Sequence, residues 1–347
     1  MSRIGVIGGG IAGCTVASEL ADAGEDVVLL EKEDELGGNI KNYGCKATDS
    51  CTKCNLCLVD SIFNSVRESD RIEVRENTAV LDCLEKEGFG LVVEDDDGEY
   101  TLDDISEIVL ATGHKRWSEL ETGTPEIFED ERILWASDFE DMLEGRKDQL
   151  CEESLEMNLG FSPDSAVFLQ CNGSRSIQEK ARYCSKVCCG YNYRIAQVLR
   201  HNFPEMDLSM FFIDMQEAGF LVNLSFEKLS ELDIDYYNCK PLRLESSSDS
   251  LQLNYEDQKE GKMEKLDTDL LVLSEGIHRG TEHEHWSKIF NLQQTEDGFL
   301  RPIWPGEETG VYLAGTVTGP GDSATTIAKS RETAYRLLDN KLVEKAN

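Results

Sequence analysis

Four cysteines lie close together in the middle of the chain, at Cys171, Cys184, Cys188 and Cys189, with the spacing Cys-x12-Cys-x3-Cys-Cys. Adjacent cysteines do not readily bridge each other, and four thiolates are the ligand number of an iron–sulfur cluster. Zinc also accepts four thiolates, but its usual sites pair two Cys-x2–4-Cys knuckles. The spacing therefore predicts a [4Fe-4S] cluster, with zinc and free or redox-active thiols as the alternatives.

A second group consists of Cys45, Cys51, Cys54 and Cys57, spaced Cys-x5-Cys-x2-Cys-x2-Cys. The last three have the rhythm of ferredoxin ligands, so a second cluster is one interpretation. A redox-active disulfide and a zinc site are the alternatives. The other four cysteines are expected to pack in the interior, as free cysteines usually do: Cys14, Cys83, Cys151 and Cys239.

The elements around the first cysteine group are a short buried strand and an amphipathic helix. The strand is predicted over Ala166–Gln170 and the helix over Tyr191–Arg200. In dinucleotide-binding folds a glycine-rich phosphate loop joins such a strand to such a helix. Further strands are predicted at Leu208–Ile213 and Leu270–Gly276, so this half of the chain is expected to be a Rossmann-like unit whose phosphate loop carries sulfur ligands.

The N-terminus has the glycine pattern that the middle of the chain lacks. An apolar strand, Ile4–Gly8, leads into Gly8, Gly10 and Gly13, spaced Gly-x-Gly-x-x-Gly, and then into a helix predicted over Ala12–Ala23. The first glycine permits the turn, the second lets the backbone approach a pyrophosphate, and the third lets helix and strand pack closely. Free N–H groups at the helix N-terminus favour phosphate.

An acidic residue ends the next predicted strand, Val27–Glu31. Glu31 lies at the distance from the glycines where an acid binds ribose hydroxyls, which suits FAD or NAD and repels a 2′-phosphate. Strand, glycine loop, helix, strand and acid together predict a dinucleotide site, against the alternative of a tight turn without a ligand.

Length and charge limit the class of protein. The 347 residues are enough for two domains, and a net charge of −34 argues against nucleic acid and anionic lipid as partners. No apolar run is long enough to span a membrane, and we expect no signal peptide and a cytoplasmic protein. In that compartment twelve cysteines indicate metal or redox chemistry. The acidic surface is expected to be solvated, with a docking face for a basic partner as the alternative.

Three further segments resemble FAD flavoproteins of the thioredoxin and glutathione reductase type. They are Gly37 with Gly38, Thr112 with Gly113, and Gly315 with Thr316, followed by Asp322. The resemblance implies that all of these residues line the FAD site, although the acid of the usual Gly-Asp pair is displaced to Asp322.

The same resemblance implies an α/β fold of two Rossmann-like units, the second modified to hold a cluster. The FAD domain is expected at residues 1–120 and 287–347, with a cysteine-rich insert at 43–60, and the second domain at 121–286. Two histidines near that boundary, His283 and His285, are expected on the solvated surface rather than in a metal site.

The sequences Gln170–Arg175 and Tyr183–Cys189, with the N-terminal glycines, resemble the flavin-binding A subunits of heterodisulfide reductases. The length is similar to the short form in the heterodisulfide-reductase-like complexes of sulfur-oxidising bacteria. The resemblance implies an oxidoreductase subunit with FAD, one [4Fe-4S] cluster or two, partner subunits, a homodimer, and redox chemistry of thiols, disulfides or sulfur compounds. No side chain is assigned a catalytic role, because the chemistry is centred on the flavin. The alternatives are a stand-alone NAD(P)H-dependent disulfide reductase and a non-catalytic FAD-binding redox scaffold.

Overall fold

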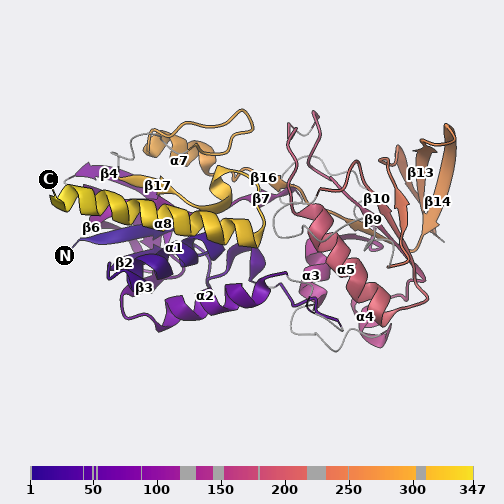
Figure 1. Ribbon diagram of the computed structural model, residues 1–347, viewed down its shortest axis with the longest axis horizontal. Helices are drawn as coiled ribbons and strands as arrows, with labels where there is room; N and C mark the ends of the chain where they lie inside the picture. The colour runs from indigo at the N-terminus through magenta and orange to yellow at the C-terminus, as the bar shows by residue number, and fades with distance from the viewer. Residues whose placement is uncertain are drawn as a thin grey trace. The chain divides into compact units, whose positions relative to one another are not determined.

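The computed structural model forms two compact units (Figure 1). Unit 1 comprises Met1–Lys41, Asn55–Lys115 and Arg279–Asn347, and unit 2 comprises Asn42–Cys54 and Arg116–His278. Residues 42–54, which we attached to the first domain from the sequence, therefore group with unit 2. The structure describes residues 2–41, 43–48, 51, 54–86, 88–117, 130–143, 152–178, 180–216, 232–248, 250–301 and 310–346.

A seven-stranded sheet forms the centre of unit 1, in the order β3-β2-β1-β6-β5-β4, with β17 also paired to β6. The strands from β3 to β6 and the β6–β17 pair are parallel, whereas β4, β5 and β6 pair antiparallel. Because helices and the antiparallel strands bury both faces of β1 and β2, these strands are continuous apolar runs. The strands are β1 (Arg3–Ile7), β2 (Val27–Leu30), β3 (Ile72–Arg75), β4 (Ala79–Lys86), β5 (Gly88–Asp95), β6 (Gly98–Leu110) and β17 (Val311–Leu313).

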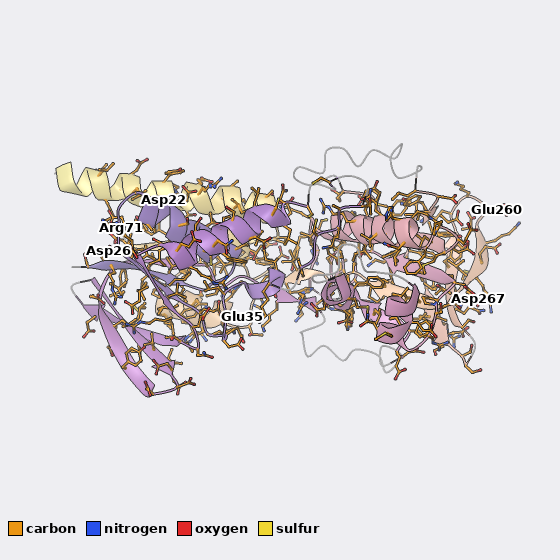
Figure 2. All side chains as sticks on the ribbon, turned by 90° about the horizontal axis from the view of Figure 1, so that it is seen from below. Asp22, Asp26, Glu35, Arg71, Glu260 and Asp267 are labelled. Carbon is orange, nitrogen blue, oxygen red and sulfur yellow. The ribbon has the colours of Figure 1, made fainter. Side chains whose placement is uncertain are left out.

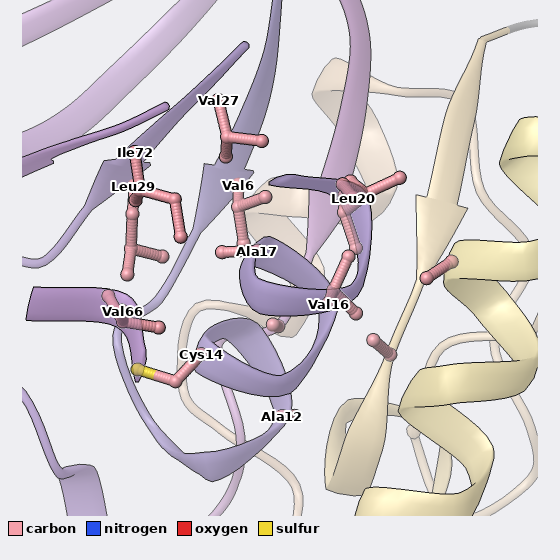
Figure 3. Close-up of a cluster of buried hydrophobic side chains, with 14 of the residues drawn as sticks. Val6, Ala12, Cys14, Val16, Ala17, Leu20, Val27, Leu29, Val66 and Ile72 are labelled. Atoms are coloured by element: carbon pink, nitrogen blue, oxygen red, sulfur yellow. The ribbon is translucent and has the colours of Figure 1, made fainter. Parts of the chain in front are cut away.

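Helices cover one face of this sheet. Alternate strand residues such as Val6 and Leu29 meet Val16 and Leu20 of the first helix in one apolar core, and the buried Cys14 belongs to the same core, as predicted (Figure 3). The opposite face packs against the β4–β5–β6 strands and a short helix that contributes Trp286. The helices of unit 1 are α1 (Ile11–Asp22), α2 (Leu56–Glu68), α7 (His283–Ile289) and α8 (Ser323–Ala346), with 3-10 turns η1 (Gly38–Ile40) and η6 (Gly315–Thr318).

Unit 2 repeats this plan around a parallel five-stranded sheet, in the order β11-β10-β9-β15-β8. Phe168 of this sheet packs against Phe139 and Leu199 of the helices, and Leu271 packs on the other face against Leu253 of a three-stranded antiparallel sheet. The parallel strands are β8 (Ile133–Trp135), β9 (Ser165–Leu169), β10 (Asp207–Phe211), β11 (Asp235–Tyr237) and β15 (Leu270–Leu273); the antiparallel strands are β12 (Arg243–Ser246), β13 (Leu251–Asp257) and β14 (Lys262–Thr268); and the helices are α3 (Ala136–Leu143), α4 (Glu152–Leu159) and α5 (Cys188–Asn202).

Two short strands, β7 (Lys115–Arg116) and β16 (Ile277–His278), pair where the chain passes between the units. Acidic side chains such as Asp22 and Glu35 in unit 1, and Glu260 and Asp267 in unit 2, are exposed (Figure 2). Among the described residues, no helix combines the length and the apolarity that crossing a bilayer requires.

Candidate functional site

In the glycine loop between β1 and α1, Gly8 and Gly13 are tightly packed, whereas Gly10 has open space beside it. A Cβ on Gly13 would lie 1.9 Å from the Gly8 carbonyl oxygen, and Gly8 has φ +105° beside Ala111, so the fold itself requires both glycines. A Cβ on Gly10 would meet only the Gly38 Cα, at 4.0 Å. Gly10 is also the N-cap of α1 and makes no side-chain capping bond. Its open face therefore leaves room for a ligand beside the α1 N-terminus.

The carboxylate of Glu31 is buried at the end of β2. One oxygen accepts the Gly9 N–H at 2.6 Å, and the other accepts the Glu33 N–H at 3.0 Å. Glu31 thus fixes the glycine loop in the described structure, while its contact with a ribose stays a prediction.

The Gly37–Gly38 segment lies directly against the glycine loop. Gly37 donates its N–H to the Gly9 carbonyl at 3.0 Å, and a Cβ on Gly38 would lie 3.2 Å from Gly10 Cα. Backbones can approach this closely only without side chains. Next in sequence, the Asn39 amide donates to the His114 carbonyl at 3.2 Å, which joins this segment to the end of β6.

The turn after β6 holds a buried polar atom without a partner, the Thr112 Oγ1. A buried hydroxyl in this state costs about 1–3 kcal/mol, so it is a mark of a site that a ligand completes. Beside it, a Cβ on Gly113 would meet only Thr316 Oγ1, at 4.0 Å. His114 Nδ1 lies 2.9 Å from the same Thr316 oxygen.

The C-terminal segment completes this surface. Gly315 approaches α1 so closely that a Cβ would lie 2.4 Å from the Cβ of Ala12. Asp322 accepts the Thr325 N–H at 2.7 Å and so caps α8. This capping bond uses one of the two carboxylate oxygens of Asp322. The contact of Asp322 with a cofactor stays a prediction.

The eleven residues predicted to bind a dinucleotide therefore all lie in a few short segments of unit 1. An open Gly10, an unpaired Thr112 hydroxyl and a helix N-terminus without a side-chain cap fit a dinucleotide with a pyrophosphate. The predicted residues are Gly8, Gly10, Gly13, Glu31, Gly37, Gly38, Thr112, Gly113, Gly315, Thr316 and Asp322.

The expectation that His283 lies on the surface was wrong. Only 1% of this residue is exposed, and its Nε2 lies 3.2 Å from the Gly113 carbonyl oxygen. Burial lowers the pKa of His283, and its bonds to Gly113 and Gly298 oppose that shift. Helix α7 turns its apolar Trp286 into the core, and His283 enters with it. His285 is exposed, as predicted, and its Nε2 lies 2.9 Å from the Leu81 carbonyl oxygen.

In unit 2, the β9–α5 connection carries the first cysteine group. Cys171 is buried, and Cys188 and Cys189 are the first two residues of α5, which begins three residues before the predicted start. Cys184 Sγ accepts the Lys186 N–H at 3.2 Å. All four cysteines are free thiols.

Burial is the main cause of the raised pKa of Cys171, Cys188 and Cys189. Negative charge on neighbouring thiols adds to it, from Cys189 on Cys171 and from Cys184 on Cys189, so the four thiols lie near one another. Lys240 opposes the shift at Cys171, whose carbonyl its Nζ contacts at 2.9 Å. The α5 N-terminus also favours thiolates, but burial outweighs it.

The backbone of this connection is held in conformations that side chains disfavour. Cys171, Arg175, Lys180 and Lys186 all have φ between 53° and 65°. Each such residue costs about 1 kcal/mol or more, and such residues cluster at ligand sites. The backbone preferences of these residues therefore do not explain the conformation of the β9–α5 connection.

The donor set and its spacing fit a cluster better than a single ion. Among the described residues, no three His, Cys, Asp or Glu side chains are arranged to hold one metal ion. A four-iron cluster is larger than one ion, so its four thiolates lie further apart.

The connection also differs from the unit 1 loop in what fills it. A Cβ on Gly173 would lie 2.1 Å from the ring of Trp117, where Gly10 is open. Trp117 is buried, and its backbone N–H donates to the Gly276 carbonyl oxygen at 3.0 Å. The ring of Trp117 therefore packs directly against the backbone of Gly173.

The second cysteine group is divided between the units. Cys45, Cys51 and Cys54 belong to unit 2, and Cys57, in the first turn of α2, belongs to unit 1. All four are at least partly accessible. Of the cysteines expected to pack, Cys83 and Cys239 lie partly buried against apolar cores, and Cys151 lies outside the described residues.

Residues 6–73 match a family described as an NAD(P)-binding Rossmann-like domain. The chain is 24% identical to the A subunit of ferredoxin:CoB-CoM heterodisulfide reductase of Methanosarcina acetivorans, over 95% of this chain and 56% of that protein. It is 23% identical to the A subunit of H(2):CoB-CoM heterodisulfide,ferredoxin reductase of Methanothermobacter thermautotrophicus, over 95% of this chain and 62% of that protein. The predicted resemblance to the A subunits of heterodisulfide reductases is confirmed along almost the whole chain, which spans about three fifths of these relatives.

The fold is similar to solved flavoprotein structures. T. acidophilum thioredoxin reductase superimposes with a TM-score of 0.63 at 15% identity, covering 98% of each chain. The predicted fold class, two Rossmann-like units of the thioredoxin reductase type, is confirmed.

Proposed function

We propose that this chain is the FAD-containing electron-transfer subunit of a heterodisulfide-reductase-like complex, an oxidoreductase. The observation that carries the proposal is the contrast between its two strand–helix connections. In unit 1 the connection is open at Gly10, whereas in unit 2 the ring of Trp117 packs against Gly173 and the connection carries four cysteines. One dinucleotide therefore binds, in unit 1, and a [4Fe-4S] cluster takes the place of the second.

The residues of unit 1 are suited to hold FAD. The α1 N-terminus and the open Gly10 would take the pyrophosphate, Glu31 would orient the glycine loop and meet the ribose, and the Thr112 hydroxyl would gain a partner. The bound groups supply the chemistry: FAD exchanges two electrons, and a cluster passes electrons singly.

In unit 2, Cys171, Cys184, Cys188 and Cys189 would hold the cluster. Three of these thiols are buried, so the loss of their protons depends on a metal centre that stabilises the thiolates. A positive-φ loop residue carries the sulfur of Cys171, whereas the first turn of α5 carries the sulfurs of Cys188 and Cys189.

A stand-alone NAD(P)H-dependent disulfide reductase needs a second dinucleotide site, and the β9–α5 connection has no Gly-x-Gly-x-x-Gly loop to receive its phosphates. A non-catalytic FAD-binding scaffold would not need a cluster that transfers electrons. Both alternatives are separated from the proposal by the experiments below.

The partners and setting follow from the same proposal. The relatives are named as A subunits of larger enzymes, so this chain is proposed to act with other subunits, on thiol/disulfide or sulfur-compound redox, as a homodimer in the cytoplasm. The second cysteine group, Cys45 to Cys57, is proposed to hold a second cluster, with a redox disulfide as the alternative.

The test is anaerobic purification followed by iron, sulfide, zinc and FAD analysis. About four irons per FAD support one cluster, and about eight support two. Zinc in place of iron, or no FAD, would overturn the proposal. Bleaching of the flavin by NADPH alone would establish the reductase instead.

A pair of variants locates the cluster. Cys171→Ser is expected to lose the iron of this cluster while FAD stays bound, because FAD belongs to the other unit. Cys239→Ser is the control, since Cys239 is a partly buried thiol of unit 2 outside the proposed ligand set. Equal iron in both variants would contradict the ligand assignment.

A further inference from the structure

A tyrosine hydroxyl lies beside one of the proposed ligand sulfurs. Tyr191 stands three residues after Cys188 on α5, on the same face of the helix. Its hydroxyl accepts the Glu275 N–H at 2.6 Å and donates to the Glu275 carbonyl oxygen at 3.4 Å. The thiol of Cys188 faces the same carbonyl, at 3.8 Å.

The Glu275 backbone that orients this hydroxyl is itself fixed. Ser274 accepts the Asn172 N–H through its Oγ at 3.3 Å, and Gly276 donates its N–H to the Asn172 carbonyl at 2.9 Å. The Glu275 carboxylate accepts the Ser137 N–H at 2.9 Å at the start of α3. The hydroxyl therefore meets a donor whose position is set by three separate bonds.

The direction of the Tyr191 proton follows from these contacts. The hydroxyl oxygen accepts the Glu275 N–H, and its proton is donated to the Glu275 carbonyl oxygen at 3.4 Å while Cys188 is a thiol. The carbonyl at 3.4 Å is a distant acceptor, whereas a thiolate is charged and attracts the proton more strongly. As a ligand, Cys188 has no proton and can only accept.

Resting on the proposed function, we infer that the Tyr191 hydroxyl donates a hydrogen bond to the ligand sulfur of Cys188 and thereby sets the reduction potential of the cluster. An electron added to the cluster increases the negative charge on its sulfurs, and a donor stabilises that charge. The proton stays on the tyrosine oxygen. The hydroxyl thus raises the potential, which makes the cluster a better electron acceptor.

The experiment is an anaerobic redox titration of the intact holoprotein, followed by EPR for the cluster and by absorbance for the flavin. Tyr191→Phe is expected to shift the cluster potential to a more negative value and to leave the flavin potential unchanged. Tyr193→Phe is the control, because it removes a hydroxyl from the same helix but from another face. Tyr191→His, which keeps a donor, is expected to restore a potential nearer that of the wild type.

The outcomes separate this inference from the proposed function. A wild type without iron would overturn both. A wild type with iron, and a Tyr191→Phe variant whose cluster potential equals that of the control, would overturn only the role of Tyr191. Should Tyr191→Phe lose iron while Tyr191→His keeps it, the donor role is supported. Loss of iron from both would assign Tyr191 to packing and overturn the inference.

Discussion

Gly10→Ala separates binding from folding at the glycine loop. Gly10 has φ −74° and ψ −176°, a conformation that alanine adopts, and the new Cβ would meet only Gly38 Cα at 4.0 Å. The FAD-free protein should therefore be stabilised, by about 0.4–1 kcal/mol, because alanine restricts the unfolded chain. The same methyl occupies the space where the backbone meets a pyrophosphate. Loss of one charge-assisted hydrogen bond costs about 1.5–3 kcal/mol, or an increase in the Kd of FAD of about 10- to 150-fold.

The assay is FAD titration of the FAD-free protein by fluorescence quenching, together with thermal unfolding. Gly13→Ala is the contrasting variant, since its Cβ would lie 1.9 Å from the Gly8 carbonyl oxygen and force the backbone apart. It should lose about 3 kcal/mol of stability or more. A Gly10→Ala variant that binds FAD as tightly as the wild type would refute the placement of the pyrophosphate over Gly10.

Three further predictions concern unit 1. Thr112→Val removes a buried hydroxyl that has no partner among the described residues. It should stabilise the FAD-free protein by about 1 kcal/mol in thermal unfolding and weaken FAD binding. A lower stability of the FAD-free variant would contradict this. Asp322→Ala should cost about 1 kcal/mol through loss of the α8 cap, whereas the exposed Asp339→Ala should not; equal denaturation midpoints would count against the cap. The pKa of His283 is lowered from its ordinary 6.5, so below that pH the unfolded state binds more protons and stability falls as the pH is lowered. His283→Gln should flatten that fall in urea titrations between about pH 7 and 5, and an unchanged slope would show that His283 does not titrate on unfolding.

The sequence predicted the parts that depend on local pattern. The glycine spacing, the apolar strand and the acid at Glu31 are constrained together by a dinucleotide turn, and β1, α1 and β2 lie within a residue of their expected bounds. The repeat of the same plan in unit 2 could be recognised because its strand–helix connection keeps its place, although its residues changed.

The parts that were missed depend on contacts distant in sequence. His283 stands among charged residues, which favours a surface position, and only the packing of α7 against the sheet buries it. The helix α5 begins at Cys188 without a capping side chain, so no signal marks its start. Nothing near Trp117 indicates that its ring fills the space beside Gly173. Tyr191 carried a weak signal, its place one helical turn after a predicted ligand.

The indole of Trp117 has a consequence for how this fold can change. A Cβ at position 173 would lie 2.1 Å from this ring, so a larger residue there fits only if position 117 changes as well. A smaller residue at position 117 would in turn leave a cavity beside Gly173. The two positions are therefore expected to vary together.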